Sequence, residues 1–277
     1  MRRHSLLVAA TAMMLGAFSH TASALTIYVV TAGNKLARYD SEDVNSITRF
    51  GYLVGFTNGD TSLVGIDYRI QDGLLYGVGN NGGIYTIDTS NSVMTFRQTL
   101  SVRLEGTSFG VDFNPAADRL RIVSNSGQNL RHDLNTAITL VDDPLDYPPA
   151  SPLNTAGPTV QGICDIAYSN NDYDPATGTT LFTLDSTLDQ LDIQSPPNNG
   201  TLSPVTKLSI PIGLYSGLDI LTTLKDGKAV TNTGYIAVDN GNVTSTLYSV
   251  DLFTGTVSAP LATTPRRIID FAVPPNQ

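Results

Sequence analysis

The feature that most constrains this chain is an internal repeat. The segment GIDYRIQDGLLYGVGNNGGIYTID, which begins at Gly65, aligns without a gap with GVDFNPAADRLRIVSNSGQNLRHD, which begins at Gly110. Looser copies begin at Asp165 and Gly217, so the successive spacings are 45, 55 and 52 residues. A period of this size indicates one supersecondary unit that is repeated in a ring or an array.

Each unit reads as four short strands. An alternating run is followed by a turn cluster, by a second run such as LLYGV or RLRIV, and by a third run that ends in aspartate, such as IYTID or LYSVD. A fourth run, such as SVMTFRQ or ITLVD, completes the unit. Alternation broken by Gly, Asn and Asp is typical of strands and hairpins, and four strands in this length match a propeller blade. No stretch after the N-terminal segment predicts a helix.

The two ends of the chain complement each other. IIDFAVP, at Ile268–Pro274, matches only the first strand of a unit, whereas Leu25–Phe50 matches only the later strands. Together they make one further blade, which closes the ring without an exposed sheet edge. We therefore predict an all-β, five-bladed β-propeller in a single domain over residues 25–277. An open β-sandwich or a two-domain β protein is the alternative.

The first 24 residues predict a cleavable signal peptide. Arg2 and Arg3 precede an apolar run over Leu6–Phe18, and Ala22-Ser23-Ala24 fits a cleavage site. The run is shorter than the roughly 20 residues that a membrane-spanning helix needs. We expect export to the periplasm or the exterior, and no transmembrane segment in the mature chain.

The charge balance is acidic, with 25 acidic against 16 basic residues and a net charge of −9. Only Glu42 and Glu105 are glutamates, so nearly all the acids are aspartates, which favour turns over helices. An acidic surface makes nucleic acid an improbable partner. We expect a monomer whose ligand or protein partner the sequence does not identify.

A G-x-S-x-G pattern at Gly106–Gly110 suggests a serine nucleophile at Ser108. The pattern requires a helix after the serine, but a strand is predicted there. The three histidines are His4, His20 and His132, and the first two belong to the signal peptide. Because His132 has no supporting motif, we assign Ser108 a structural hydroxyl and predict no catalytic residues.

Metal chemistry has few candidate ligands. A catalytic zinc site usually takes two or three histidines, which the mature chain lacks. Oxygen ligands for calcium are available in SNNDYDPATG, where Asn171, Asp172 and Asp174 lie close together, but the segment also reads as an ordinary turn, which we favour. The single cysteine, Cys164, excludes an intramolecular disulfide, and its apolar neighbours predict a buried, inert thiol.

Aspartate recurs inside the first strand of the unit. It occupies Asp67, Asp112, Asp219 and Asp270, with Ala167 in the fifth place. The first strand of a propeller blade lines the central channel, so we expect these four carboxylates at similar depth. A ring of acids either binds a cation or polar ligand, with calcium as the candidate, or accepts hydrogen bonds that join the blades. Recurrence in nearly every blade favours the structural role.

Two further features are candidates for ligand binding. Arg119 and Arg121 share one face of a predicted strand, with Arg131 on the next strand, so they either balance the channel acids, bind an anion, or form a surface ladder with nearby aspartates. The Pro-rich insertion over Asp142–Pro158 interrupts the repeat and is expected to cap one face.

These motifs resemble a bacterial family of secreted proteins known as a domain of unknown function. The resemblance rests on T-S-F-G-x-D-F-N-P at Thr107–Pro115, D-R-x-R at Asp118–Arg121, G-Q-N-L-R at Gly127–Arg131 and P-P-N-N-G-T-L at Pro196–Leu202. It implies a propeller-like fold and export, and brings no catalytic residues.

The leading functional hypothesis is an exported, non-enzymatic propeller that binds a small ligand or a protein partner on one face. The alternatives are an aspartate-based hydrolase or lyase, with or without calcium, in the central channel, and a structural protein of the cell envelope or matrix.

Overall fold

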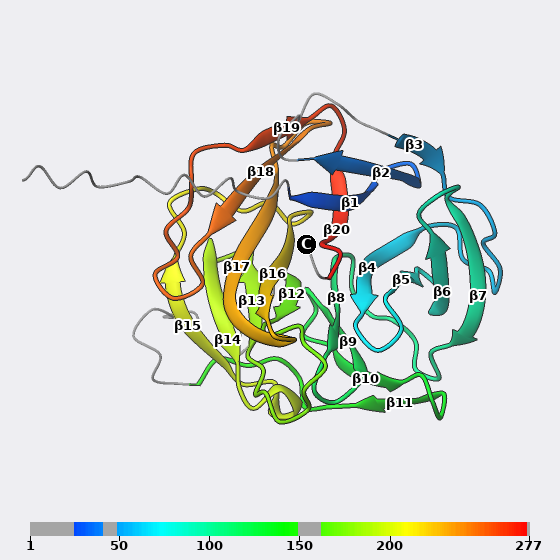
Figure 1. The fold of residues 1–277 in the computed structure, drawn as a ribbon, viewed down its shortest axis with the longest axis horizontal. Helices are drawn as coiled ribbons and strands as arrows, with labels where there is room; N and C mark the ends of the chain where they lie inside the picture. The colour runs from blue at the N-terminus through cyan, green and yellow to red at the C-terminus, as the bar shows by residue number, and fades with distance from the viewer. Residues whose placement is uncertain (1–24, 41–48, 149–161, 276–277) are drawn as a thin grey trace, which may run out of the picture.

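The computed structural model describes residues 25–40, 49–148 and 162–275. Five four-stranded antiparallel sheets surround a central axis, which confirms the predicted five-bladed β-propeller (Figure 1). The expected signal peptide at residues 1–24 lies outside the described residues, as do residues 149–158 of the Pro-rich insertion.

The first and last strands of the chain share blade 1. Its strands, in order from the channel outward, are β20 (Ile268–Ala272), β1 (Thr26–Thr31), β2 (Lys35–Asp40) and β3 (Arg49–Tyr52). Val30 pairs with Asp270 and Val29 with Phe271 in an antiparallel register. The predicted closure of the ring by the two chain ends is therefore confirmed.

The other four blades follow in chain order. Blade 2 contains β4 (Leu63–Arg69), β5 (Leu74–Gly79), β6 (Gly83–Asp88) and β7 (Val93–Thr99). Blade 3 contains β8 (Phe109–Asn114), β9 (Arg119–Ser124), β10 (Asn129–Asp133) and β11 (Ile138–Val141). Blade 4 contains β12 (Ile163–Tyr168), β13 (Leu181–Asp185), β14 (Gln190–Gln194), the 3₁₀ turn η1 (Pro197–Asn199) and β15 (Leu202–Lys207). Blade 5 contains β16 (Gly217–Lys225), β17 (Lys228–Asp239), β18 (Ser245–Val250) and β19 (Ala262–Thr264).

Burial falls from the axis to the rim of the disk. All six residues of the inner strand β12 are buried, whereas the outer strands β7 and β11 each keep one buried residue. The apolar core accordingly lies between neighbouring blades. Tyr76 of blade 2, for example, packs edge-on against Phe113 of blade 3 with ring centroids 5.3 Å apart. Inner strands are covered on both faces, which explains why their sequences are nearly continuously apolar.

Helical structure is almost absent from the described part of the chain, where η1 is the one helical element. Within the same residues, no helix has the length and apolar character needed to cross a membrane.

Candidate functional site

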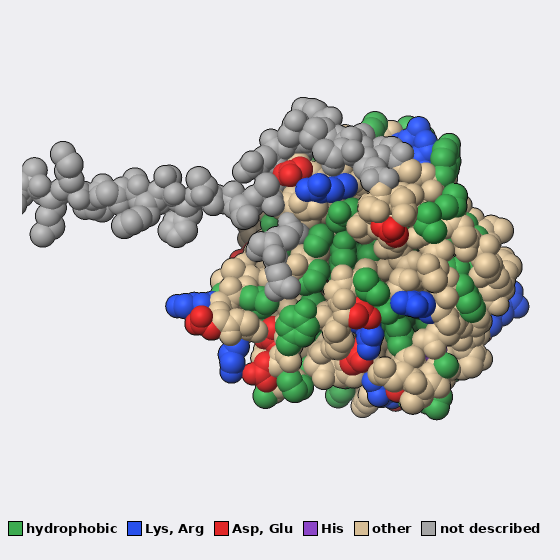
Figure 2. Space-filling view, turned by 45° about the vertical axis from the view of Figure 1, so that its right-hand side comes forward, with side chains coloured by type: hydrophobic (Ala, Val, Ile, Leu, Met, Phe, Trp, Pro, Cys, Tyr) green, Lys and Arg blue, Asp and Glu red, His purple; other side chains and the backbone are tan. Residues whose placement is uncertain are grey.

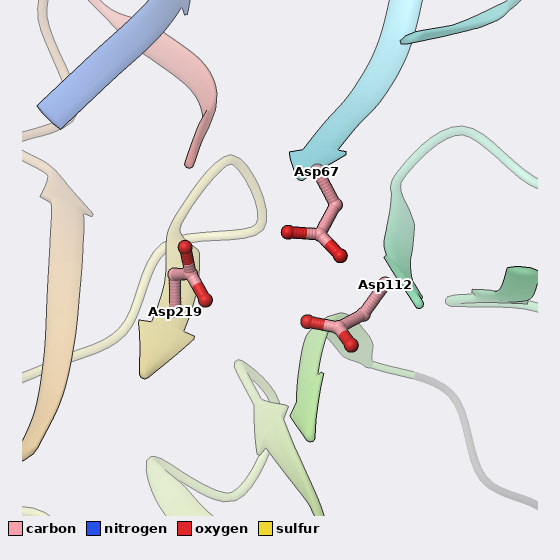
Figure 3. A group of neighbouring side chains, drawn as sticks. All are labelled: Asp67, Asp112 and Asp219. Atoms are coloured by element: carbon pink, nitrogen blue, oxygen red, sulfur yellow. The ribbon is translucent and has the colours of Figure 1, made fainter. Parts of the chain in front are cut away.

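Five aspartates, one from each inner strand, lie buried along the channel, and they occupy two levels. Asp67, Asp112 and Asp219 form the aspartate trio, in which one carboxylate oxygen of each lies within 4.8 Å of the others (Figure 3). Asp165 and Asp270 form the aspartate pair, whose carboxyl groups hydrogen-bond to each other. Two carboxyl groups can do this only when one of them carries a proton.

The hydrogen bonds between blades define the two levels. The amide of Phe113, one residue after Asp112, donates to Asp67 Oδ2 at 2.7 Å. The amide of Ile66, one residue before Asp67, donates to Asp270 Oδ2 at 2.6 Å. Asp270 therefore lies two residues away from the trio level, roughly 7 Å along an extended strand.

The expectation that Asp67, Asp112, Asp219 and Asp270 share one depth is thus wrong for Asp270. Sequence reasoning also missed Asp165, which lies two residues before the expected fifth position at Ala167 and so points to the same face of its strand. The spacing of two residues between Asp165 and Ala167 was the signal in the sequence that could have identified Asp165 as a channel residue. At the trio level, blades 4 and 1 carry alanine, as Ala167 and Ala272. At the pair level, blades 2, 3 and 5 carry glycine, as Gly65, Gly110 and Gly217.

Four of the five carboxylates join their own strand to the next blade. Asp219, for instance, accepts the amide of Ile220 at 2.6 Å and the amide of Val273 in blade 1 at 2.6 Å. Asp67, Asp165 and Asp270 each accept one amide from their own strand and one from the following blade in the same way. These bonds are the inter-blade role that the recurrence of aspartate indicated.

Asp112 departs from this pattern for a geometric reason. Around the ring the aspartates alternate between the two levels, but five blades cannot alternate completely, and the break falls between blades 2 and 3. There Asp67 and Asp112 occupy the same level, and Asp67 takes the Phe113 amide that Asp112 would otherwise accept. One carboxylate oxygen of Asp112 accepts the amide of Tyr168 in blade 4, while its Oδ1 is buried without a hydrogen-bond partner among the described residues.

Burial raises the pKa of every aspartate in the channel. For Asp67 and Asp112 the pKa lies well above the usual range, first because burial disfavours the charged carboxylate and second because of the neighbouring carboxylates. Burial raises the pKa of Asp219 to about 6, against the hydrogen bonds from Val273 and Ile220. The trio therefore resists carrying three negative charges at neutral pH.

The three arginines singled out from the sequence form their ion pairs with aspartates outside the channel. Arg121 is buried between blades 3 and 4 and donates to Asp142 at 2.9 Å, Asn198 at 2.6 Å and the Tyr168 hydroxyl at 3.2 Å. Arg131 pairs with the other oxygen of Asp142 at 3.1 Å. Arg119 pairs with Asp133 at 3.0 Å, which is the surface ladder considered above. Arg121 pairs in register with Asp112 of the adjacent strand β8, but the ion pairs of the three arginines are made with Asp133 and Asp142. A balance of the channel aspartates by these arginines therefore stays a prediction.

We expect Arg121→Met to destabilise the protein by about 3 kcal/mol, because it removes the short bond to the buried Asn129 oxygen and the buried ion-pair partner of Asp142. Arg119→Met is the matched control. Its ion pair is partly exposed, so the expected cost is below about 1 kcal/mol. Urea unfolding of both variants measures the difference, and equal costs would contradict the assigned role of Arg121.

The contacts of Ser108, His132 and Cys164 are those of residues that stabilise the fold. The Ser108 hydroxyl donates to the Leu214 carbonyl at 2.7 Å and so ties blade 3 to the segment that precedes blade 5. His132 lies on β10, where its Nδ1 is 2.9 Å from the Thr139 hydroxyl. Cys164 is buried, and burial raises the pKa of its thiol well above the usual range. A thiol in that environment is unreactive.

The turn that was a candidate for calcium is held by the protein's own groups. Asp172 is buried and accepts the Ala229 amide at 2.9 Å, and Asp174 pairs with Lys228 at 3.2 Å. The carboxylates of this segment thus anchor the β16–β17 hairpin.

The described part of the Pro-rich insertion, Asp142–Pro148, packs into blade 4. Tyr147 is buried, with its hydroxyl 2.8 Å from Asp185 and 2.7 Å from Asp192. Burial raises the pKa of Asp192 to about 7. This segment therefore contributes to the core of the blade.

One pocket, which we call the mouth pocket, lies at the end of the channel where the inner strands begin. It encloses about 560 Å³. Val64, Phe109 and Ile269, each one residue before the pair level, contribute to its floor. Its walls come from the loop at Thr31–Asn34, from Asn80 and Asn81, from Arg103, Leu104 and Gly106–Ser108, and from Tyr215. Among the described residues that line it, Arg103 is the one charged side chain, and it is exposed.

The opposite end of the channel is covered by the C-terminal segment, which Figure 1 places near the axis. Val273, Pro274 and Pro275 line a cavity of about 10 Å³ together with Asp67 and Thr222. The trio thus lies near this covered end, and the mouth pocket lies at the other.

Charged side chains are scattered over the outer surface. Figure 2 shows Lys and Arg side chains interspersed with Asp and Glu side chains, among hydrophobic and other side chains, on the face that it presents. The mouth pocket is distinguished by its shape and by the positive charge of Arg103 at its wall.

Three solved structures are among those that resemble the chain, each weakly. Hydrazine synthase of Kuenenia stuttgartiensis gives a TM-score of 0.41 at 14% identity, with 78% of this chain and 53% of that chain covered. The computationally designed Ika8 protein gives 0.39 at 9% identity, with 90% and 63% covered. A protein of unknown function from Bacteroides thetaiotaomicron gives 0.46 at 14% identity, with 86% and 58% covered. The chain thus spans between about half and two thirds of these proteins.

No protein of curated function matches the sequence. A family model does match, over residues 35–272, which includes the inner strands of all five blades and both aspartate levels. By this match, and in agreement with its five-bladed fold, the chain belongs to the family described as Domain of unknown function (DUF4394).

Proposed function

We propose that this protein is an exported, non-enzymatic binding protein that holds a small anionic molecule with an apolar body in the mouth pocket. The pocket itself carries the proposal, because it offers about 560 Å³ at the channel entrance, a volume suited to a small ligand. Export rests on the signal peptide expected at residues 1–24.

The lining of the pocket suggests the ligand class. Leu104, Phe109, Tyr215 and Ile269 offer apolar surface, and Arg103 offers a guanidinium group with several N–H donors. The asparagine side chains contribute less to recognition, since Asn80 Oδ1 already accepts the Thr61 amide at 2.8 Å and Asn81 Nδ2 donates to the Asn58 carbonyl at 2.7 Å. An apolar molecule with one carboxylate or sulfonate fits this arrangement.

Binding is favoured over hydrolysis or lyase chemistry by the state of the candidate catalytic groups. The Ser108 hydroxyl is engaged with a carbonyl, and the channel aspartates are at most 8% exposed. A nucleophile or a general base must reach the substrate, and these groups face protein atoms instead. The mouth pocket needs only complementary shape and charge.

The apolar sulfonate dye 1-anilinonaphthalene-8-sulfonate tests the proposal by fluorescence titration. We expect saturable binding that weakens about tenfold in Arg103→Gln, because the charge-assisted contact is lost. Ala32→Trp should abolish binding, because this exposed residue lines the pocket and a bulky ring there fills it. Ala259→Trp, at an exposed position outside the mouth pocket, is the matched control.

Equal dye binding by wild type, Ala32→Trp and Arg103→Gln would reject the mouth pocket as the site. Binding lost in Ala259→Trp as well as Ala32→Trp would mean that any added tryptophan perturbs the protein. A wild type that binds no dye would instead favour the structural role in the envelope or matrix.

A further inference from the structure

The aspartate trio gathers three carboxylates in one buried place, and no ion pair to a cationic side chain compensates them among the described residues. Three carboxylates converge from blades 2, 3 and 5 on one point near the axis (Figure 3). Asp67, Asp112 and Asp219 are 8%, 3% and 4% exposed. Burying several like charges together is strongly unfavourable unless protons or a cation compensate them.

The unpartnered oxygen of Asp112 is a second and independent indication. The amide that would satisfy Asp112 Oδ1 is donated to Asp67, and the other Asp112 oxygen accepts from Tyr168. Oδ1 is buried without a hydrogen-bond partner among the described residues, and a carboxylate oxygen of Asp112 points toward Asp67 and Asp219 (Figure 3). A buried polar atom in this state normally has a partner, and none of the described residues donates to it.

A cation satisfies the trio better than a proton does. One proton bridges two oxygens and leaves the third unpaired, whereas a metal ion contacts all three. Calcium takes oxygen ligands at about 2.3–2.6 Å, so ligand oxygens on one ion lie up to about 5 Å apart. The separations within 4.8 Å fit this ion, and magnesium, with ligands at about 2.0–2.1 Å, requires a tighter group.

We propose that Asp67, Asp112 and Asp219 bind one calcium-class divalent cation in the channel, where Asp112 carries the one carboxylate oxygen of the trio that is buried without a hydrogen-bond partner among the described residues. The ion leaves one net negative charge on the site, which the surrounding backbone amides offset. The ion also links blades 2, 3 and 5 at the level where the alternation of aspartates breaks. This site is separate from the mouth pocket and does not depend on the proposed function.

The test uses the full mature chain, stripped with EDTA and desalted. Titration with calcium chloride in a calorimeter should give one site per chain. Saturating calcium should raise the Tm by about 5 °C or more at pH 8, since a ligand that binds only the folded state stabilises it. Magnesium chloride at the same concentration should raise it less.

Asp112→Asn should abolish the calcium response while leaving the metal-free Tm equal or higher, because an amide N–H then faces the two remaining carboxylates. Asp174→Asn is the matched control at the turn that was the alternative calcium site, and it should keep the full response. A wild type without a Tm shift at 10 mM calcium, or an Asp112→Asn variant that retains the shift, would overturn the proposal. Loss of the shift in Asp174→Asn would overturn it too, by placing the ion in the turn.

A measurement without any variant guards against failed folding of Asp112→Asn. Protons compete with calcium for the trio, so the Tm gain at a fixed subsaturating calcium concentration should shrink from pH 8 to pH 5. A gain of equal size at both pH values would contradict a site made of these carboxylates.

Discussion

Gly110→Ala is expected to destabilise the protein by at least about 3 kcal/mol and so to leave little folded protein. A Cβ at this position would lie 2.6 Å from the Ile166 nitrogen and 2.7 Å from the Asp165 carbonyl carbon. These are backbone atoms of the neighbouring inner strand, so no side chain can rotate out of the way. The glycine therefore determines how closely blade 3 approaches blade 4 at the pair level.

The matched control is Gly178→Ala, which meets no atom within 4 Å and needs no positive φ. Its expected effect on the free energy of unfolding is within about 0.5 kcal/mol. Circular dichroism and urea unfolding of both variants decide the point. If Gly110→Ala were as stable as wild type, this would contradict the close approach of β8 to β12 at Gly110.

The metal-free protein is expected to become more stable as the pH falls from 8 to about 5. Burial raises the pKa of Asp219 to about 6 and that of Asp192 to about 7, each from 3.8. A raised carboxyl pKa means that the folded state holds a proton that the unfolded state has released, so stability is fully present below pH 3.8 and is lost as the pH rises through 6 and 7. The raised pKa corresponds to about 3 kcal/mol for Asp219 and to about 4 kcal/mol for Asp192.

His132 opposes this trend. Burial lowers its pKa from 6.5, so its contribution is present above that value and is lost as the pH falls further. One histidine does not offset the several raised carboxyl groups, which also include Asp67 and Asp112. Urea unfolding in EDTA at pH 5, 6.5 and 8 measures the balance. Stability that falls steadily from pH 8 to pH 5 would show that the channel carboxylates are ionised in the folded state.

Calcium should flatten this pH profile, because the cation replaces protons as the compensation for the trio. Asp112→Asn should flatten it also, with or without calcium, since it removes one of the three like charges. The same experiment on Asp174→Asn should reproduce the wild-type profile.

The positions of the inner strands β4, β8 and β16 could be predicted from sequence because the G-x-D pattern recurs at Gly65, Gly110 and Gly217 with the turn residues of hairpins between the copies. Asp165 was missed because it lies two residues before the aligned position. The alternation of side chains within a strand shows which face a residue occupies, but it does not tell how far one blade is shifted along the axis relative to the next.

The arginines also show that a residue's place on a strand does not identify its partners from other parts of the chain. Arg121 was correctly placed on a strand, yet its partners Asn129, Asp142 and Asn198 come from a neighbouring strand, from the loop after blade 3 and from η1. The mouth pocket was not predicted, because its lining comes from several loops that the closed ring brings to one end of the channel. Arg103 carries no motif that would mark it in the sequence.

By itself, the sequence determined the number of blades, the closure of the ring by the two chain ends and the burial of an aspartate in the inner strands, because repeat period and alternation are local properties. Only the tertiary structure decided that the aspartates form two levels, that Asp112 lacks a partner and that a pocket opens beside Arg103. The physical reason is that an odd number of blades prevents complete alternation around the ring, and such a constraint exists only once the ring is closed.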